Sequence, residues 1–319
     1  MALKEDKYYL VFNKKEAGPY PYVSAPIFCE GNDKLAYFVQ YSYPDGEKYL
    51  VITDGNKEQK TIVSDYPSQY TFSPDCTKFA YVISTFDGVN NISYVVSGNY
   101  QSKKYASVTG LTFSPDSKRL GFEAGKTDAY GKYLDSLVID GEEGAWYSSI
   151  SFGPVFSPDG KHIAYIAEKA QGDFTFFVDS LESSQTNPAG PIEFSADSKR
   201  VAFTQWSESG SVVIVAEIAN FGLVEEVQTS FEEIVMGGGG IGGGGYYVPY
   251  EKYLKFAPDN LTVLYPARNG EKYFMVRDSK TGENFNGYIW FPIVSENKKS
   301  VGYVAQSGND IYWVEEDVK

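Results

Sequence analysis

Histidine and cysteine are scarce in this sequence, whose 319 residues include one His, His162, and two Cys, Cys29 and Cys76. A Ser-His-Asp or Cys-His catalytic site needs a histidine, and a His/Cys zinc site needs several such ligands. His162 opens a short strand directly after a turn, where we expect a structural role. We therefore predict no catalytic residue, no metal ligand and no cofactor.

Long apolar runs are also lacking. No stretch approaches the ~20 apolar residues of a membrane span, and the start MALKEDK lacks the apolar core of a signal peptide. We therefore expect no membrane insertion. The same start predicts a cytoplasmic protein if the chain is complete, and a periplasmic or otherwise exported one if it is a mature fragment.

Positive charge is in short supply. Lys and Arg number 28 against 42 Asp and Glu, which gives a formal net charge of −14. Such a surface repels nucleic acid and anionic lipid, so neither is expected as a partner. Solubility alone would account for the acidic excess. The partner that we expect is another protein.

Aromatic residues and one repeated turn are abundant. Tyr and Phe number 27 and 21. In Phe156-Ser157-Pro158-Asp159-Gly160 a strand ends at the Phe, and Pro158 and the Asp-Gly pair form a turn. The apolar run Ile163–Ala167 then predicts a second strand. Seven such units follow one another, anchored by Phe28, Phe72, Phe113, Phe156, Phe194, Phe256 and Phe291.

The spacing of these anchors indicates the fold. They lie 35 to 44 residues apart, except for one interval of 62. A period near 40 in an all-β sequence is typical of a β-propeller with four short strands per blade. We predict a single all-β domain over residues 1–319, a seven-bladed β-propeller of four-stranded antiparallel blades. Since open sheet edges invite aggregation, we expect the N- and C-terminal strands to close the ring in one composite blade. Residues 287–315 would supply three of its strands, and residues 7–16 the outer one.

The repeated turn carries a family resemblance. It is similar to the F-S-P-D-G-K-x-[IL]-A-[YF] mark of the TolB-like (WD40-like) β-propeller repeats, over essentially the whole chain. The resemblance implies the propeller fold. It implies little about function, because assembly factors of the periplasm, gating domains of peptidases and scaffolds share this repeat.

The Ser-x-Asp of each turn raises the possibility of calcium binding, or of the sialidase-type Asp-box. No copy has the Thr-Trp that ends such a box, and single aspartates in separate blades do not form a calcium cage. We expect each Asp to cap its own turn. Cys29 and Cys76 fall at or beside this turn in adjacent repeats. We expect a free pair, because neighbouring blades splay apart and disulfide geometry is demanding.

The strand order divides the loops between two faces. All Ser-Pro-Asp turns lie on one face, and the loops that join second to third strands, or one blade to the next, lie on the other. Exposed aromatic side chains on irregular loops suit partner binding. The binding candidates on this second face are Tyr43, Phe86, Tyr130 and Trp206.

A glycine-rich insertion over residues 231–252 causes the interval of 62. A nucleotide loop would need a helix after the glycines, and Tyr-Tyr-Val-Pro follows instead. Bare backbone beside tyrosines can approach a partner closely, although a slack linker is an equal alternative. The candidates here are Gly237, Gly240, Ile241, Gly245, Tyr246, Tyr247 and Tyr250.

These observations favour a non-catalytic scaffold or assembly-factor propeller. It would bind a protein through its channel-mouth loops and the insertion, either as a monomer on its own or as a subunit of a larger complex. Two alternatives stay open. One is a hydrolase with a metal held by carboxylates in the channel, and the other is a propeller that binds a small ligand or glycan on its aromatic rim.

Overall fold

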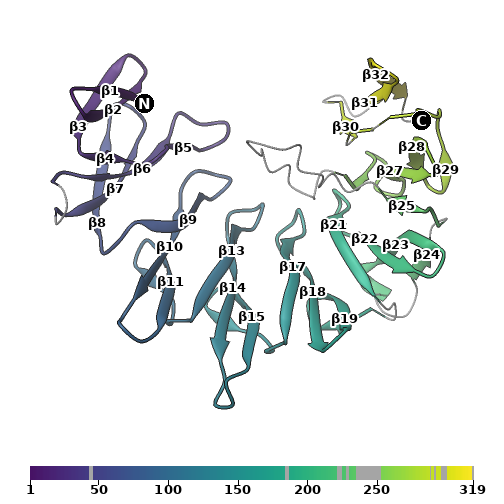
Figure 1. The fold of residues 1–319 in the computed structure, drawn as a ribbon, viewed down its shortest axis with the longest axis horizontal. Coiled ribbons are helices and arrows are strands. Elements are labelled where there is room, and N and C mark those ends of the chain that lie inside the picture. The colour runs from purple at the N-terminus through teal and green to yellow at the C-terminus, as the bar shows by residue number, and fades with distance from the viewer. Residues whose placement is uncertain are drawn as a thin grey trace. The chain divides into compact units, whose positions relative to one another are not determined.

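The computed structural model describes residues 1–42, 46–183, 187–220, 225–227, 230–234, 253–287, 289–290, 292–295 and 300–317. The chain divides into two compact units, Met1–Trp146 (unit 1) and Tyr147–Lys319 (unit 2). In the described residues, the regular structure consists of β-strands and one short 3-10 helix, η1 (Ile218–Asn220) (Figure 1). These residues contain no helix that is long and apolar enough to cross a membrane.

Unit 1 contains four antiparallel sheets that follow one another along the chain. The first consists of β1 (Ala2–Lys4), β2 (Lys7–Phe12) and β3 (Lys15–Tyr20). The second consists of β4 (Tyr22–Val23), β5 (Ile27–Phe28), β6 (Leu35–Gln40), β7 (Lys48–Thr53) and β8 (Glu58–Val63). The third consists of β9 (Pro67–Phe72), β10 (Phe79–Phe86), β11 (Asn91–Ser97) and β12 (Tyr100–Gln101). The fourth consists of β13 (Ser107–Phe113), β14 (Leu120–Thr127), β15 (Tyr133–Ile139) and β16 (Glu142–Glu143).

Unit 2 also contains four sheets in its described residues. They begin with β17 (Ser149–Phe156), β18 (Ile163–Ala170), β19 (Asp173–Val178) and β20 (Leu181–Glu182). Next come β21 (Pro188–Phe194), β22 (Arg200–Ser207), β23 (Gly210–Glu217) and β24 (Glu225–Val227). The third sheet has β25 (Glu233–Ile234), β26 (Lys255–Phe256), β27 (Val263–Asn269), β28 (Lys272–Arg277) and β29 (Lys280–Thr281). The last has β30 (Ile293–Val294), β31 (Ser300–Ser307) and β32 (Asp310–Asp317).

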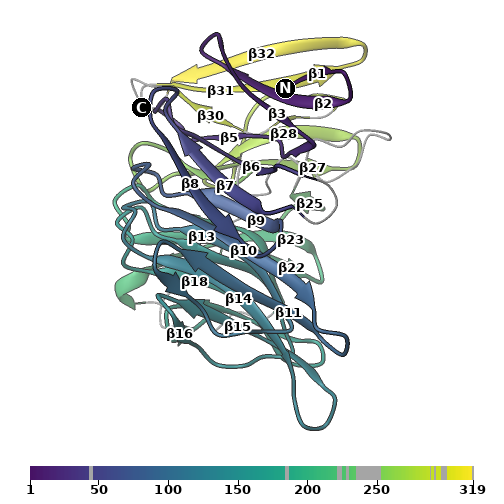
Figure 2. The same cartoon turned by 90° about the vertical axis from the view of Figure 1, so that its left-hand side faces the viewer.

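Four of these eight sheets are four-stranded meanders whose strands pair in chain order (Figure 2). In the two five-stranded sheets, two short strands share the first position of the same meander. Such a meander is typical of a β-propeller blade. Among the described residues, six first strands end at a predicted anchor, and these anchors are Phe28, Phe72, Phe113, Phe156, Phe194 and Phe256. Within each unit, neighbouring sheets pack face to face. Phe203 of β22, for example, stacks on Phe176 of β19 with 3.9 Å between the ring centroids. The all-β fold with successive antiparallel blades is thus confirmed.

Most anchor positions are buried as predicted. Phe113, Phe156, Phe194 and Phe256 are buried, as are the paired positions Tyr81, Phe122, Phe203 and Tyr265. Two positions differ from the prediction, because Phe72 and Tyr165 are half-buried. Phe28, for which burial was not predicted, is exposed at the margin of its sheet. Phe291 lies outside the described residues.

The predicted role of residues 7–16 as the outer strand of the last blade is wrong. β2 is the middle strand of its own sheet, with β1 on one side and β3 on the other. Both of its edges are therefore occupied. Leu10 and Tyr20 of this sheet pack with Tyr37 and Val51 of the second sheet in one core cluster. Burial of this apolar face explains why the N-terminal residues form a sheet of their own.

The glycine-rich insertion interrupts the first strand of its blade. Glu233 and Ile234 pair with Arg268 and Ala267 near the end of β27, and β26 pairs with the beginning of β27. The first strand is thus built from both sides of the insertion. The predicted insertion began at residue 231, but residues 233–234 belong to the sheet. Residues 235–252 lie outside the described residues.

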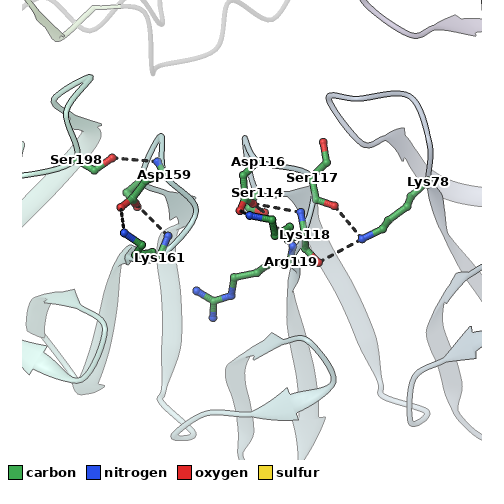
Figure 3. Close-up of polar contacts among 10 residues, drawn as sticks. Lys78, Ser114, Asp116, Ser117, Lys118, Arg119, Asp159, Lys161 and Ser198 are labelled. Atoms are coloured by element: carbon green, nitrogen blue, oxygen red, sulfur yellow. Dashed lines mark hydrogen bonds and ion pairs between the residues drawn. The ribbon is translucent and has the colours of Figure 1, made fainter.

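A repeated hydrogen bond joins the Ser-Pro-Asp turns of adjacent sheets within each unit. The residue that follows the Asp of the turn has a positive φ. Its side-chain oxygen accepts a hydrogen bond from a backbone N–H of the preceding turn. In unit 1 the Asp75 N–H donates to Ser117 Oγ at 2.9 Å. In unit 2 the Asp159 N–H donates to Ser198 Oγ at 3.0 Å (Figure 3). The Asp197 N–H donates to Asn260 Oδ1 at 3.2 Å. We call this contact the turn hook.

Cys76 occupies the hook position of its turn and forms a disulfide with Cys29 of the preceding sheet. The two Cα atoms lie 5.9 Å apart. The prediction of a free cysteine pair is therefore wrong. It assumed that neighbouring blades splay apart, whereas the hook brings their turns into contact. The bridge is a covalent counterpart of the hook, and the Lys34 ammonium adds a hydrogen bond to the Cys76 carbonyl at 2.9 Å.

Candidate functional site

An open groove of about 530 Å³ lies in unit 2, between the sheets β17–β20 and β21–β24. Its walls come from β17, from the beginning of β19, from the beginning of β21 and from the end of β22. This end of the sheets carries the loops that join second to third strands, which is the face expected to bind a partner. The residues that line the groove are Ser151, Phe152, Phe174, Asn187, Pro188, Ala189, Gly190 and Trp206.

Trp206 is positioned by the hairpin of β22 and β23. It pairs with Ser211 near the end of β22, where the apolar pattern of the strand has run out. Its backbone N–H donates to the Asn187 carbonyl at 3.1 Å, which ties the end of β22 to the segment that precedes β21. The Trp206 side chain is 49% exposed. A half-exposed tryptophan in a groove offers a large apolar surface at little cost in conformational entropy.

Phe152 and Gly190 bring the two sheets close together. A Cβ on Gly190 would lie 2.3 Å from the Phe152 ring, so a side chain at position 190 would displace that ring. The Phe152 ring can therefore lie directly against the β21 backbone. Both β17 and β21 have irregular registers here, between residues 150 and 155 and between residues 189 and 192. Phe152 and Phe174 also pack on the buried cluster beneath the groove, which holds them in place.

The chemistry of the groove suits binding. Among the described residues, its lining includes no carboxylate, histidine, cysteine or cationic side chain. Ser151 and Asn187 contribute polar side chains to this described part of the lining. Carboxylates lie beside it in the chain: Glu168 pairs with Phe174 across β18 and β19, and Glu208 follows Trp206 by two residues. The groove can therefore accept an apolar or aromatic side chain that has positively charged neighbours.

The other predicted binding residues have different outcomes. Phe86 at the end of β10 and Tyr130 between β14 and β15 lie on equivalent loops of unit 1 and are 62% and 96% exposed. Asp87 and Asp128 accept backbone N–H groups of these loops, so these carboxylates cap turns. Tyr43, Gly237, Gly240, Ile241, Gly245, Tyr246, Tyr247 and Tyr250 lie outside the described residues. The role of all these candidates in binding stays a prediction.

The Ser-Pro-Asp carboxylates also cap their own turns. Ser73 Oγ donates to Asp75 Oδ1 at 2.6 Å, and the Thr77 N–H donates to the same oxygen at 3.0 Å. These bonds, led by that of Ser73, lower the pKa of Asp75 to about 2. Ser114 and the residues after it do the same for Asp116 (Figure 3). The aspartates are used within their turns, as the sequence predicted. Among the described residues, no group of three or more His, Cys, Asp or Glu could hold a metal ion.

His162 has a structural position. Its Nδ1 atom lies 2.8 Å from Asp179 Oδ2, which belongs to the turn between β19 and β20. Arg119 makes the same contact in unit 1, where its Nε donates to Asp140 Oδ2 at 2.9 Å. The equivalent residue in the next sheet, Arg200, pairs with Glu217. In three successive sheets, this position thus carries a cationic or polar side chain that contacts an acidic residue at the end of the third strand or directly after it.

Glu123 and Asp135 form a pair of carboxyl groups on neighbouring strands of unit 1, β14 and β15. Burial, followed by the charge of Asp135, raises the pKa of Glu123 from 4.5 to about 7, while a hydrogen bond with Thr109 acts in the opposite direction. Neither carboxyl group lines the groove. Because the pKa is higher in the folded state, the resulting stabilisation is complete below about pH 4.5 and is lost as the pH rises through 7.

We therefore expect Glu123→Gln to flatten the pH dependence of unfolding between pH 4.5 and pH 7. Wild type should lose on the order of 2 kcal/mol over this interval, after allowance for the partial exposure of the side chain. Urea denaturation at several pH values measures the effect. Glu142→Gln, at an exposed position on β16 of the same sheet, is the matched control and should follow wild type. Coincident profiles for wild type and Glu123→Gln would contradict the expectation.

Comparison with known proteins gives the following. No protein-family model and no curated protein matches the chain. Similar solved structures include a prolyl endopeptidase, with 12% identity, a TM-score of 0.47 and coverage of 93% of this chain and 49% of that chain. TolB from Acinetobacter baumannii has 18% identity, a TM-score of 0.36 and coverage of 78% and 62%. The β-propeller domain of the Trilobed protease from Pyrococcus furiosus has 12% identity, a TM-score of 0.41 and coverage of 93% and 97%.

This chain spans about half the length of the prolyl endopeptidase. All three identities are below 25% and all three TM-scores are below 0.5. The fold assigned above therefore rests on the strand pairing of the chain itself.

Sequence reasoning found Trp206 and missed the rest of the groove. Phe152, Phe174 and Gly190 come from three strands of two sheets and meet only in the folded chain. One signal was available in the sequence. Gly153-Pro154 and Gly190-Pro191 interrupt the first strands of two successive blades, and such pairs mark an irregular strand where backbones approach closely.

Proposed function

We propose that this chain is a non-catalytic β-propeller that binds a protein partner, and that the Trp206 groove is the centre of the binding surface. The observation that carries the proposal is the groove itself, with a half-exposed tryptophan beside Phe152, Phe174 and Pro188. Aromatic side chains in a preformed apolar hollow are the anchors that dominate the energy of protein interfaces. The six described sheets whose first strand ends at an anchor phenylalanine support the proposal of a seven-bladed propeller as the platform.

The lining of the groove favours binding over catalysis. Hydrolysis requires a nucleophile or activated water and a group that transfers protons. The groove offers the Ser151 hydroxyl and the Asn187 amide, and no base lies among the described residues that line it. An apolar hollow of this kind gains free energy from the burial of a partner's side chain, at about 25 cal/mol per Å².

The charge of the chain indicates the kind of partner. The net charge of −14 repels acidic proteins and attracts basic ones over distances of about a Debye length. Asp173 and Glu208 stand next to groove residues in the sequence and add local negative charge. We therefore expect the partner to present an aromatic or proline side chain with Lys or Arg on either side of it.

A selection of random peptides displayed on phage against the immobilised protein tests this function. Enriched peptides should carry an aromatic or proline residue flanked by Lys or Arg. Calorimetric titration should then show that Trp206→Ala weakens their binding by about tenfold or more, as truncation of an interface anchor does. Gly190→Ala should weaken it as well, because the new Cβ displaces the Phe152 ring.

Phe28→Ala is the matched control, because this phenylalanine is exposed and belongs to unit 1. Its affinity for the selected peptides should equal that of wild type. The proposal fails if Trp206→Ala and Phe28→Ala bind the selected peptides equally well while both retain the melting temperature of wild type. It fails also if no peptide is enriched.

A further inference from the structure

The first of the repeated turns, residues 29–34, lacks the side chains that cap the later turns. In a later turn the serine hydroxyl donates to the carboxylate of the aspartate two residues further on, as Ser73 Oγ does to Asp75 Oδ1 at 2.6 Å. Cys29 stands at the serine position, because its N–H closes the turn on the carbonyl five residues further on, as the Ser73 N–H does. Gly31 then stands at the aspartate position. The first turn therefore cannot form this cap.

A disulfide takes the place of the missing cap and of the turn hook. In the later turns, the residue at the hook position joins two turns through its side-chain oxygen. Cys76 holds this position in the third sheet of unit 1, has no side-chain oxygen and is bonded to Cys29 instead. Lys34 adds one hydrogen bond between the two turns, from its ammonium to the Cys76 carbonyl at 2.9 Å. The contact between these turns therefore depends mainly on the covalent bond.

The strand next to the bridge is short. β5 directly precedes Cys29 and pairs with β6 through two residues, Ile27 and Phe28. Ile27 packs against the core cluster shared by the second and third sheets, and the centroid of the Phe28 ring lies 5.9 Å from that of Phe12 in the first sheet. Segments with few backbone hydrogen bonds open at a low cost in free energy. Residues 27–34 are therefore the part of unit 1 that we expect to loosen when the bridge is lost.

We propose that the Cys29–Cys76 disulfide is a redox-sensitive latch, which fixes residues 27–34 on the turn of the third sheet and releases them on reduction. A thiol is a weak hydrogen-bond donor. The Cys29 sulfur, 3.7 Å from the Ser73 carbonyl, therefore cannot replace the covalent bond after reduction. The turns of the third and fourth sheets stay joined, because their hook does not involve a cysteine. The latch lies within unit 1 and does not depend on the Trp206 groove.

The chemistry of the latch gives two states. Reduction passes two electrons and two protons from a dithiol to the bridge. The S–S bond breaks, Cys29 and Cys76 each gain an S–H bond, and the dithiol closes to its own disulfide. Because the chain contains two cysteines in all, the bridge has no alternative partner within the chain. The redox poise of the surroundings therefore determines whether the latch is closed or open.

Amide hydrogen exchange, followed by mass spectrometry on the full-length protein with and without dithiothreitol, tests the latch. Reduction should speed exchange within residues 27–34 by about tenfold or more. Exchange within β13 and β14 of the fourth sheet should not change. Exchange of residues 27–34 that reduction leaves unaltered would overturn the proposal. Equal acceleration in all four sheets of unit 1 would overturn it too, because the bridge would then stabilise the unit as a whole.

The double variant Cys29→Ala/Cys76→Ala keeps the latch open in both conditions. Its residues 27–34 should exchange as fast as those of the reduced wild type, with and without dithiothreitol. Ser117→Ala is the matched control, because it removes a turn hook and leaves the bridge intact. It should speed exchange within residues 73–78, while reduction still releases residues 27–34. Slow exchange of residues 27–34 in the double variant would contradict the proposal, since contacts other than the bridge would then hold the segment.

Discussion

Reduction of the Cys29–Cys76 disulfide is expected to lower the free energy of unfolding by about 2–4 kcal/mol. The bridge closes a loop with a sequence separation of 47 and joins the second and third sheets of unit 1. Opening it restores freedom to the unfolded chain and removes the covalent link between two turns. Urea denaturation with and without dithiothreitol measures the loss. Since disulfides form in oxidising surroundings, the protein must first be prepared without reductant.

The double variant Cys29→Ser/Cys76→Ser provides the control. Its stability should not respond to reductant. Ser at position 76 would stand where Ser117 and Ser198 make turn hooks, so the variant should retain more stability than Cys29→Ala/Cys76→Ala. Thiol titration of the folded, oxidised protein should detect no free thiol. Two free thiols, or an unfolding curve that reductant leaves unchanged, would contradict the bridge.

Truncation of Phe203 is expected to have a still larger effect. Its side chain has no exposed surface and stacks on Phe176 with 3.9 Å between the ring centroids. Phe203→Ala removes this contact between two sheets of unit 2 and leaves a cavity, at an expected loss of about 3–5 kcal/mol in the free energy of unfolding. Phe203→Leu fills part of the space and should lose less.

Phe86→Ala is the comparison for this loss. The Phe86 side chain is 62% exposed at the end of β10, and its truncation should change stability by less than about 0.5 kcal/mol. Denaturation followed by circular dichroism gives both values. A loss below about 1 kcal/mol for Phe203→Ala would mean that the packing between these sheets contributes little, contrary to the expectation from core truncations.

The repeated turn explains why the blades could be predicted from the sequence. Strand pairing within a blade is local, since Pro158 and Asp159 fix the turn and the apolar residues on either side fix the register. Buried anchors such as Phe156 and Phe194 follow from the same local pattern. Each blade could therefore be located from about 40 consecutive residues.

Contacts between blades were harder to predict. The residue after the turn's Asp was interpreted as part of its own turn, and the structure shows that Ser117, Ser198 and Asn260 bond to the preceding blade. The disulfide was missed for the same reason. The N-terminal strand was assigned to the last blade because an open sheet edge invites aggregation, and its apolar pattern does not specify which strand it pairs with. The burial of this strand against the second sheet of unit 1 determines its position in the structure.

The Trp206 groove shows the same limit. An exposed tryptophan on a loop can be noticed in a sequence, but its neighbours Phe152 and Gly190 lie 54 and 16 residues before it in the chain. Their contact depends on the face-to-face packing of two sheets. Sequence reasoning could therefore single out Trp206 and its face of the sheets. The groove itself could be identified only in the structure, because its residues meet only in the folded chain.

Site-specific photo-crosslinking from position 206 tests the proposed function most directly. Trp206 is replaced by benzoylphenylalanine, the variant is irradiated in an extract of the cells that produce the protein, and adducts are identified by mass spectrometry. Phe28 replaced in the same way is the control, since its side chain is exposed in unit 1. Binding through the groove predicts one defined protein adduct from position 206 that is absent from position 28, with the crosslinked peptide containing Lys or Arg beside an apolar residue. The same adducts from both positions, or none from position 206, would contradict it.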